Sequence, residues 1–174
     1  LGQHTTDVSV RWIWQGGAGI NWAEQQVGRC AGFRLVILMI GGNDLDAGWC
    51  SPYQLADWIG FLAHQILQEG AETVVIPSLW PRSNVNYNTR ARQYAGIMER
   101  RFSFDPQVTF WLWDRRQAWR NVDGVHFLHH GYRQAIRYLI AFIVWVINHN
   151  LWWIWITYNL RLLIDVSMDK ELVI

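Results

Sequence analysis

The sequence of 174 residues is poor in cysteine, in proline and above all in lysine. Its two cysteines, Cys30 and Cys50, are too few for a disulfide framework and lack a metal-ligand spacing, although a bridge between them stays open. Lys170 is the single lysine beside fourteen arginines, and the formal net charge of +1 favours no polyanionic partner. Eight arginines lie within 82–120, but three acidic residues are interspersed there. We therefore expect no nucleic-acid partner.

Two further absences concern ligands. The sequence has neither a Gly-x-Gly-x-x-Gly segment nor a Walker-type loop, so nucleotide binding has no positive support and we expect no cofactor. We also expect no metal, because the His-x-x-His-His segment at 126–130 would need a further ligand from elsewhere in the chain. In contrast, hydrophobic residues make up 51% of the chain and tryptophan occurs 13 times, which predicts a folded domain with a sizeable core.

A continuous apolar run at 36–40 stops at two glycines and an Asn-Asp pair. A run that is apolar at successive positions is typical of a strand buried on both faces, as in a parallel sheet. The glycines free the backbone where the strand leaves the sheet. Open α/β sheets bind their ligands at the carboxyl ends of the strands, so we expect Asn43 on a loop that faces a crevice.

Strands and helices alternate along the rest of the chain. The segment 51–54 (Ser-Pro-Tyr-Gln) has the pattern of a capping box and predicts a helix start, with Gly70 closing that helix. The alternation predicts an α/β fold, in which a parallel sheet carries helices on both faces in three layers. The predicted strands are 7–14, 33–40, 72–77 and 108–113, and the predicted helices are 21–27, 52–70, 91–102 and one that begins near Gly131.

The second informative segment is 123–126 (Asp-Gly-Val-His), between the last predicted strand and the last predicted helix. Asp123 can accept a hydrogen bond from the ring of His126, which leaves the other ring nitrogen free to act as a general base. Asn43 can donate a side-chain N–H, and a glycine at 16 or 17 a backbone N–H. Two such donors that converge on one point form an oxyanion hole.

These residues resemble the SGNH (GDSL-type) esterase family over roughly residues 7–147, through Gly-Gly-Asn-Asp-Leu after a buried strand and Asp-Gly-Val-His before Gly-Tyr. The resemblance implies a flavodoxin-like three-layer α/β/α sandwich. It implies that Asn43 is the oxyanion asparagine, that Gly17 rather than Gly16 is the oxyanion glycine, and that Asp123 and His126 are the catalytic acid and base. The implied substrate is a small-molecule ester or an acylated carbohydrate.

One feature of that family is missing. Its nucleophile is a serine in a Gly-Asp-Ser turn after the first strand, and no such turn occurs here, since Ser9 lies within a predicted strand and Ser51 caps a helix. We expect the first strand and its serine upstream of Leu1, which makes 1–150 a partial domain that is inactive as it stands. Whether the chain is an enzyme therefore stays open. The alternative is a non-catalytic module that binds an acyl chain or a sugar through Trp80 and Trp119.

The segment 151–174 forms a hydrophobic extension beyond the family-like region. The stretch 138–156 is long enough to span a bilayer, but the three polar residues within it make a span costly. We expect the helix to pack inward up to about Ile147. Two interpretations of the extension stay open: peripheral membrane contact with tryptophans near the headgroups, and a segment without a selected fold. Compartment and oligomeric state are not predicted.

Overall fold

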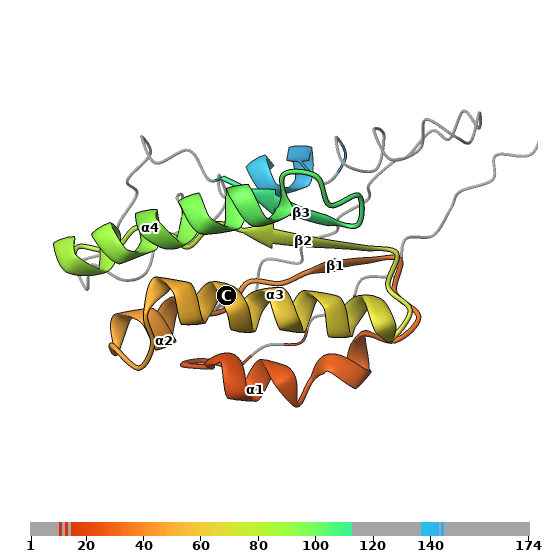
Figure 1. Ribbon diagram of the computed structural model, residues 1–174. Coiled ribbons are helices and arrows are strands. Elements are labelled where there is room, and N and C mark those ends of the chain that lie inside the picture. The colour runs from red at the N-terminus through yellow and green to blue at the C-terminus, as the bar shows by residue number, and fades with distance from the viewer. Residues whose placement is uncertain (1–10, 12, 14, 113–136, 143, 145–174) are drawn as a thin grey trace, which may run out of the picture. The chain divides into compact units, whose positions relative to one another are not determined.

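The computed structural model describes residues 11, 13, 15–112, 137–142 and 144. The chain divides into two compact units, one formed by Gly17–Gly131 and the other by Leu1–Gly16 together with Tyr132–Ile174. The described part of the first unit holds the sheet, its helices and Asn43 (Figure 1). The predicted strand at 7–14 and the catalytic segment at 123–126 fall on residues outside the described ones.

Three strands of the first unit form one parallel sheet in the order β1-β2-β3. Val36 of β1 lies beside Val74 of β2, and Val75 of β2 lies beside Thr109 of β3. The elements, in chain order, are α1 (Ile20–Glu24), the 3-10 helix η1 (Val27–Cys30), β1 (Leu35–Ile37), α2 (Gly42–Asp46), α3 (Pro52–Gln68), β2 (Thr73–Pro77), α4 (Val85–Phe102) and β3 (Val108–Trp111).

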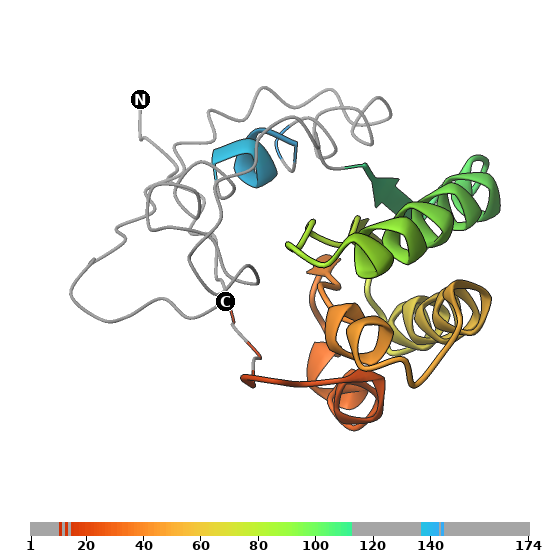
Figure 2. The same ribbon diagram turned by 90° about the vertical axis from the view of Figure 1, so that its left-hand side faces the viewer.

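The two helices that connect the strands, α3 and α4, lie on the same face of the sheet (Figures 1 and 2). Both connections step in the same direction across the sheet, and crossovers of one hand then place their helices on one side. The predicted α/β fold with a parallel sheet is thus confirmed. The last predicted helix, which begins near Gly131, lies mostly outside the described residues, and the expectation of helices on both faces stays a prediction.

Helix α3 begins as its sequence predicts. The Ser51 hydroxyl accepts a hydrogen bond from the Gln54 backbone, and the Gln54 side chain accepts one from the Ser51 backbone, which completes the capping box. Helical spacing predicts one apolar stripe from five residues of this helix, and four of them are buried, namely Leu55, Ile59, Leu62 and Ile66. The fifth, Trp58, is 42% exposed, because helical spacing places it at the border of the buried face.

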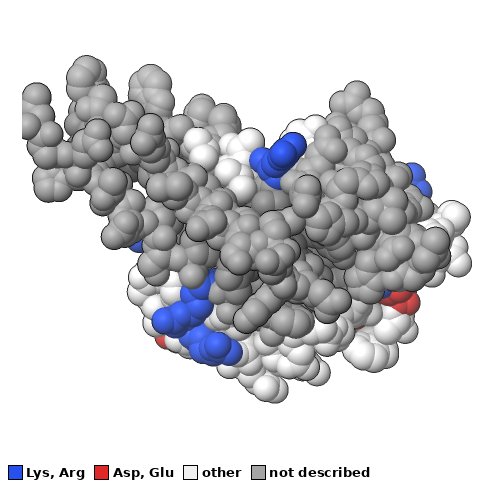
Figure 3. All heavy atoms as spheres, turned by 180° about the vertical axis from the view of Figure 1, so that it is seen from behind, with Lys and Arg blue, Asp and Glu red and all other residues white. Residues whose placement is uncertain are grey.

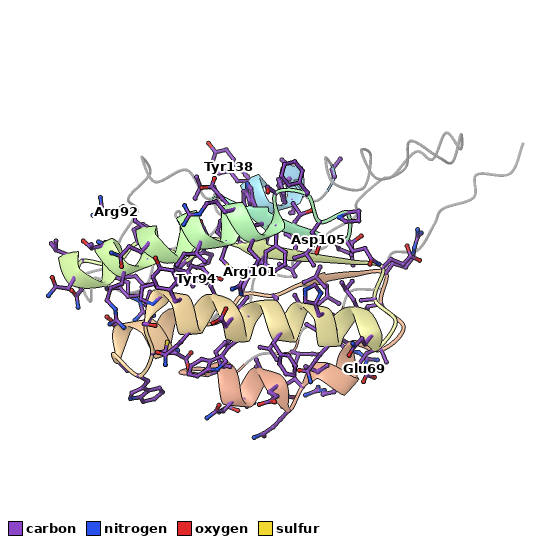
Figure 4. All side chains as sticks on the ribbon, in the orientation of Figure 1. Glu69, Arg92, Tyr94, Arg101, Asp105 and Tyr138 are labelled. Atoms are coloured by element: carbon purple, nitrogen blue, oxygen red, sulfur yellow. The ribbon has the colours of Figure 1, made fainter. Side chains whose placement is uncertain are left out.

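Helix α4 packs against α3 and β3 through the apolar residues that the sequence singled out. Tyr94 is fully buried between them, and its ring contacts Phe110 edge-on at 6.1 Å between centroids (Figure 4). Near the end of α4, Arg101 reaches α3 and donates to the carbonyl of Ala56 and to the carboxylate of Asp57. The helix begins at Val85 rather than at 91, where the prediction started it, because Asn84 caps its first turn.

Two expectations about the strand predicted at 33–40 are wrong. The strand covers Leu35–Ile37 rather than 33–40, and its residues are half-buried rather than buried on both faces. Burial of a strand depends on what packs on its faces, and among the described residues α3 and α4 cover the same face of the sheet. Helix α1 is also shorter than predicted and continues into η1, which contains Gly28 rather than ending at it. Cys30 and Cys50 are both free thiols.

In the second unit, residues 137–142 and 144 are helical. Tyr138 is 42% exposed, whereas Leu139, Ile140 and Phe142 are half-buried, and the expectation that this stretch packs inward stays a prediction. Among the described residues, no helix has both the length and the apolar character to cross a membrane. The extension at 151–174 lies outside the described residues, so its two interpretations stay predictions.

Basic side chains on the face opposite to Figure 1 appear in separate groups rather than as one continuous surface among the described residues (Figure 3). The absence of a nucleic-acid partner stays a prediction.

Candidate functional site

The Gly-Gly-Asn-Asp segment forms a tight turn into helix α2. Gly41 precedes the helix with φ +97°, a conformation that favours glycine, and a Cβ at this position would lie 2.8 Å from Leu55 Cδ1. Asn43 therefore lies in the first turn of a short helix, not on a loop as we expected. The helix follows the carboxyl end of β1, which is the predicted edge of the sheet.

Two segments from elsewhere in the chain hold the half-buried Asn43 carboxamide. Its Nδ2 donates a hydrogen bond to the carbonyl oxygen of Ala18 at 3.1 Å. Its Oδ1 accepts one from Nη2 of Arg82 at 2.9 Å. The carboxamide thus joins the loop before α1 to the loop after β2.

Asp44 makes a second connection to the loop before α1. Its carboxylate, which is 6% exposed, accepts a hydrogen bond from the Ile20 backbone N–H at 3.1 Å. Ile20 is the first residue of α1, so Asp44 caps a helix distant in sequence rather than its own turn. Gly19 makes room for this contact, since a Cβ there would lie 2.6 Å from Asp44 Oδ1.

Gly17, the predicted second oxyanion donor, is exposed and adopts φ +71°. It directly precedes Ala18, whose carbonyl accepts the Asn43 hydrogen bond. The structure therefore brings the two predicted oxyanion residues, which are 26 positions apart in the sequence, to adjacent places. A Cβ on Gly17 would meet no atom within 4 Å, so the space beside it is open among the described residues.

Arg82, which the sequence analysis did not single out, is the centre of the polar contacts around Asn43. Its Nη1 pairs with the Asp46 carboxylate at 2.5 Å, and its guanidinium lies 4.7 Å from the centre of the Tyr87 ring. Asn88 accepts from its backbone N–H at 2.8 Å and donates to its carbonyl. The position of Arg82 just after β2, at the same carboxyl edge as Asn43, is the sequence feature that could have identified this arginine.

Burial has the largest effect on the pKa of Tyr87, whose ring lies beside Arg82. It raises the pKa of Tyr87 to about 12, while the positive charge of Arg82 lowers that pKa to a smaller extent. Arg90, also on α4, secures the end of α2 by donating to the carbonyl oxygens of Leu45 and Cys50. Helix α4 therefore supports the Asn43 segment from one side.

The predicted acid and base, Asp123 and His126, lie outside the described residues, as do Trp119, His129 and His130. Their proximity to Asn43 stays a prediction. Within the described ranges, no group of three or more His, Cys, Asp or Glu side chains could hold a metal ion. His64 is exposed on α3 with its ring near that of Phe102, as expected for a surface or packing residue.

The described serines, Ser51, Ser78, Ser83 and Ser103, do not lie in the Gly-Asp-Ser turn that the resemblance requires. Ser51 caps α3, and Ser103 donates to the carbonyl of Arg100. Ser78 follows β2 but is only 4% exposed, and Ser83 lies in the exposed loop before α4. The expectation of a nucleophile from outside this sequence stays a prediction.

Comparison with known proteins supports the fold rather than a family. No model of a protein family matches the chain, and no curated protein matches it. The inhibitor-bound form of an aryl esterase from M. smegmatis is similar in structure, with a TM-score of 0.60 and 19% identity over 73% of this chain and 67% of that chain. A peptidoglycan O-acetylesterase is similar with a TM-score of 0.59 and 22% identity, over 76% of this chain and 45% of that chain. At such identities the similarity shows a shared α/β fold.

Proposed function

We propose that this chain carries the oxyanion and base residues of an SGNH-type ester hydrolase domain. The single observation that supports this most is the contact between the Asn43 carboxamide and the backbone at Ala18, beside Gly17. The two structural neighbours, both SGNH-type hydrolases, add support at the level of the scaffold. The substrate class is a small-molecule ester or an acylated carbohydrate.

The proposed reaction begins with a serine contributed from upstream of Leu1. Its hydroxyl oxygen attacks the ester carbonyl while His126 takes its proton, and Asp123 orients the ring of His126. The carbonyl oxygen becomes negatively charged and accepts hydrogen bonds from Asn43 Nδ2 and from the Gly17 backbone N–H. The alcohol then leaves with the proton from His126, and water releases the acid from the acyl-serine in a second, equivalent step.

The test compares two chains in p-nitrophenyl acetate hydrolysis. The 174-residue chain should show no hydrolysis above its His126→Ala variant, with His64→Ala as the matched histidine control. A chain extended by the upstream coding sequence should contain a strand followed by Gly-Asp-Ser and should hydrolyse the ester. In that chain Asn43→Ala should lower kcat by about 10²- to 10³-fold, because it removes one oxyanion donor.

The exposed Asn86 on α4 provides the matched control, and Asn86→Ala should leave kcat unchanged. A burst of p-nitrophenol from the 174-residue chain would overturn the assignment of the nucleophile to an upstream segment. An extended chain that has no such serine and no hydrolysis would favour the alternative, a module that binds acyl chains or carbohydrates without catalysis.

A further inference from the structure

We infer that Arg82 is a positioning residue, which determines which end of the Asn43 carboxamide is offered to the oxyanion. The inference rests on the proposed function of Asn43. An asparagine amide can rotate by half a turn and exchange its oxygen for its nitrogen at little cost. Only the nitrogen can stabilise an oxyanion, because the amide oxygen is an acceptor and would repel it.

The neighbours of Asn43 distinguish the two ends of its amide. A guanidinium can only donate, so the amide atom 2.9 Å from Arg82 Nη2 must be the oxygen. A backbone carbonyl can only accept, so the atom 3.1 Å from Ala18 O must be the nitrogen. The second Nδ2 hydrogen has no partner among the described residues, and the proposed reaction uses this hydrogen.

Arg82 can act as a rigid support because it is itself held on several sides. Its side chain is 14% exposed, paired with Asp46 and placed over the Tyr87 ring. Both backbone groups of Arg82 are bonded to the side chain of Asn88. Since the Asp46 carboxylate compensates its charge, Arg82 contributes orientation rather than a net positive field beside Asn43.

The second glycine of the Gly-Gly pair fits the same arrangement. A Cβ on Gly42 would lie 3.3 Å from Arg82 Nη2 and 3.5 Å from the Tyr87 hydroxyl. The missing side chain at Gly42 thus leaves room for the guanidinium beside Asn43. Gly41 is favoured by its backbone conformation, whereas a side chain at Gly42 would crowd the guanidinium.

The first test measures the Asn43 amide directly in the 174-residue chain, by the ¹⁵N–¹H resonances of its side chain and their hydrogen exchange. Arg82→Met should move these resonances toward those of a solvent-exposed amide and accelerate exchange about tenfold, because an amide that is no longer held at its oxygen can rotate and release the bond from Nδ2 to Ala18 O. Arg100→Met is the matched control, because Arg100 is an exposed arginine of α4. The backbone spectrum reports whether each variant is folded. If Arg82→Met does not fold, Arg82→Lys replaces it in this test.

The second test is a double-mutant cycle in the serine-containing chain, with p-nitrophenyl acetate. Arg82→Met should lower kcat by about 10- to 100-fold with little change in KM, and should cost nothing further when Asn43 is already alanine. Unchanged Asn43 resonances in the first test, or additive losses in the second, would overturn the inference. If the unaltered extended chain is inactive, the proposed function fails, and the amide resonances still decide whether Arg82 holds Asn43.

Discussion

The two ends of the parallel sheet carry the same chemical pair in different surroundings. At the carboxyl end, Arg82 and Asp46 pair at 2.5 Å with side chains that are 14% and 29% exposed. At the amino end, Arg34 and Glu72 pair at 3.0 Å with side chains that are 74% and 58% exposed. Arg82 of the first pair also bonds Asn43 and Asn88. In the second pair, the described side-chain hydrogen bonds join only Arg34 and Glu72.

The comparison shows that an ion pair matters through what it positions. Exposed pairs contribute about 0–1 kcal/mol to stability, because water screens them and two long side chains lose freedom. A partly buried pair costs desolvation and is retained where both partners have further bonds. Here the polar contacts gather at the carboxyl edge, which is where the candidate site lies.

The largest expected difference in stability is between substitutions of two glycines that have similar conformations and lie at opposite ends of the sheet. Gly41 has φ +97° and lies against Leu55, whereas Gly70 has φ +101° with nothing within 4 Å of an added Cβ. Gly41→Ala should lower the free energy of unfolding by about 2–5 kcal/mol, from backbone strain and overpacking together. Gly70→Ala should cost only about 1–2 kcal/mol from strain. Urea denaturation followed by tryptophan fluorescence measures both, and equal losses would contradict the packing argument.

An intermediate effect is expected when the acid of each ion pair is removed. Asp46→Ala leaves the partly buried Arg82 guanidinium without its carboxylate and should cost about 1–3 kcal/mol in the free energy of unfolding. Glu72→Ala should change the free energy of unfolding by less than about 0.5 kcal/mol, since the side chains of Glu72 and Arg34 are both exposed. The same denaturation measurement compares the two, ideally at low and high salt. A larger loss for Glu72→Ala would reverse the distinction between the two ends.

The smallest effect at neutral pH concerns Tyr87, beside Arg82. Burial raises its pKa to about 12, above the value of about 10 expected in the unfolded chain. Its contribution to stability is therefore complete below about pH 10 and is lost as the pH rises toward about 12, because only the unfolded state releases the proton. Tyr87→Phe should make the alkaline decline of the unfolding free energy shallower. An identical decline in both proteins would show that Tyr87 does not titrate in this way.

The periodic features of the sequence predicted much of the fold. The capping box at Ser51, the buried positions of α4 and the strand β2 all follow from local patterns, and local patterns are what helix caps and amphipathic faces depend on. The burial of β1 and of Trp58 was predicted wrongly, because burial depends on which neighbours an element meets.

For the candidate site, the order of the elements predicted where its residues lie but not the bonds between them. Asn43 and Gly17 could be assigned to one edge of the sheet, because parallel strands place their carboxyl ends together. The bonds that hold Asn43 could not be predicted, since Ala18 and Arg82 lie 25 and 39 residues away along the chain. Arg82 resembled the other arginines in the sequence until the fold placed it beside the carboxamide.

The alternation of apolar runs and turn residues was therefore sufficient to specify an α/β sheet and the edge where polar residues would gather. The direction in which the Asn43 amide points was decided only by the folded chain. The physical reason is that strand and helix formation depend on neighbouring residues, whereas an amide is oriented by a donor and an acceptor that must both arrive from distant segments.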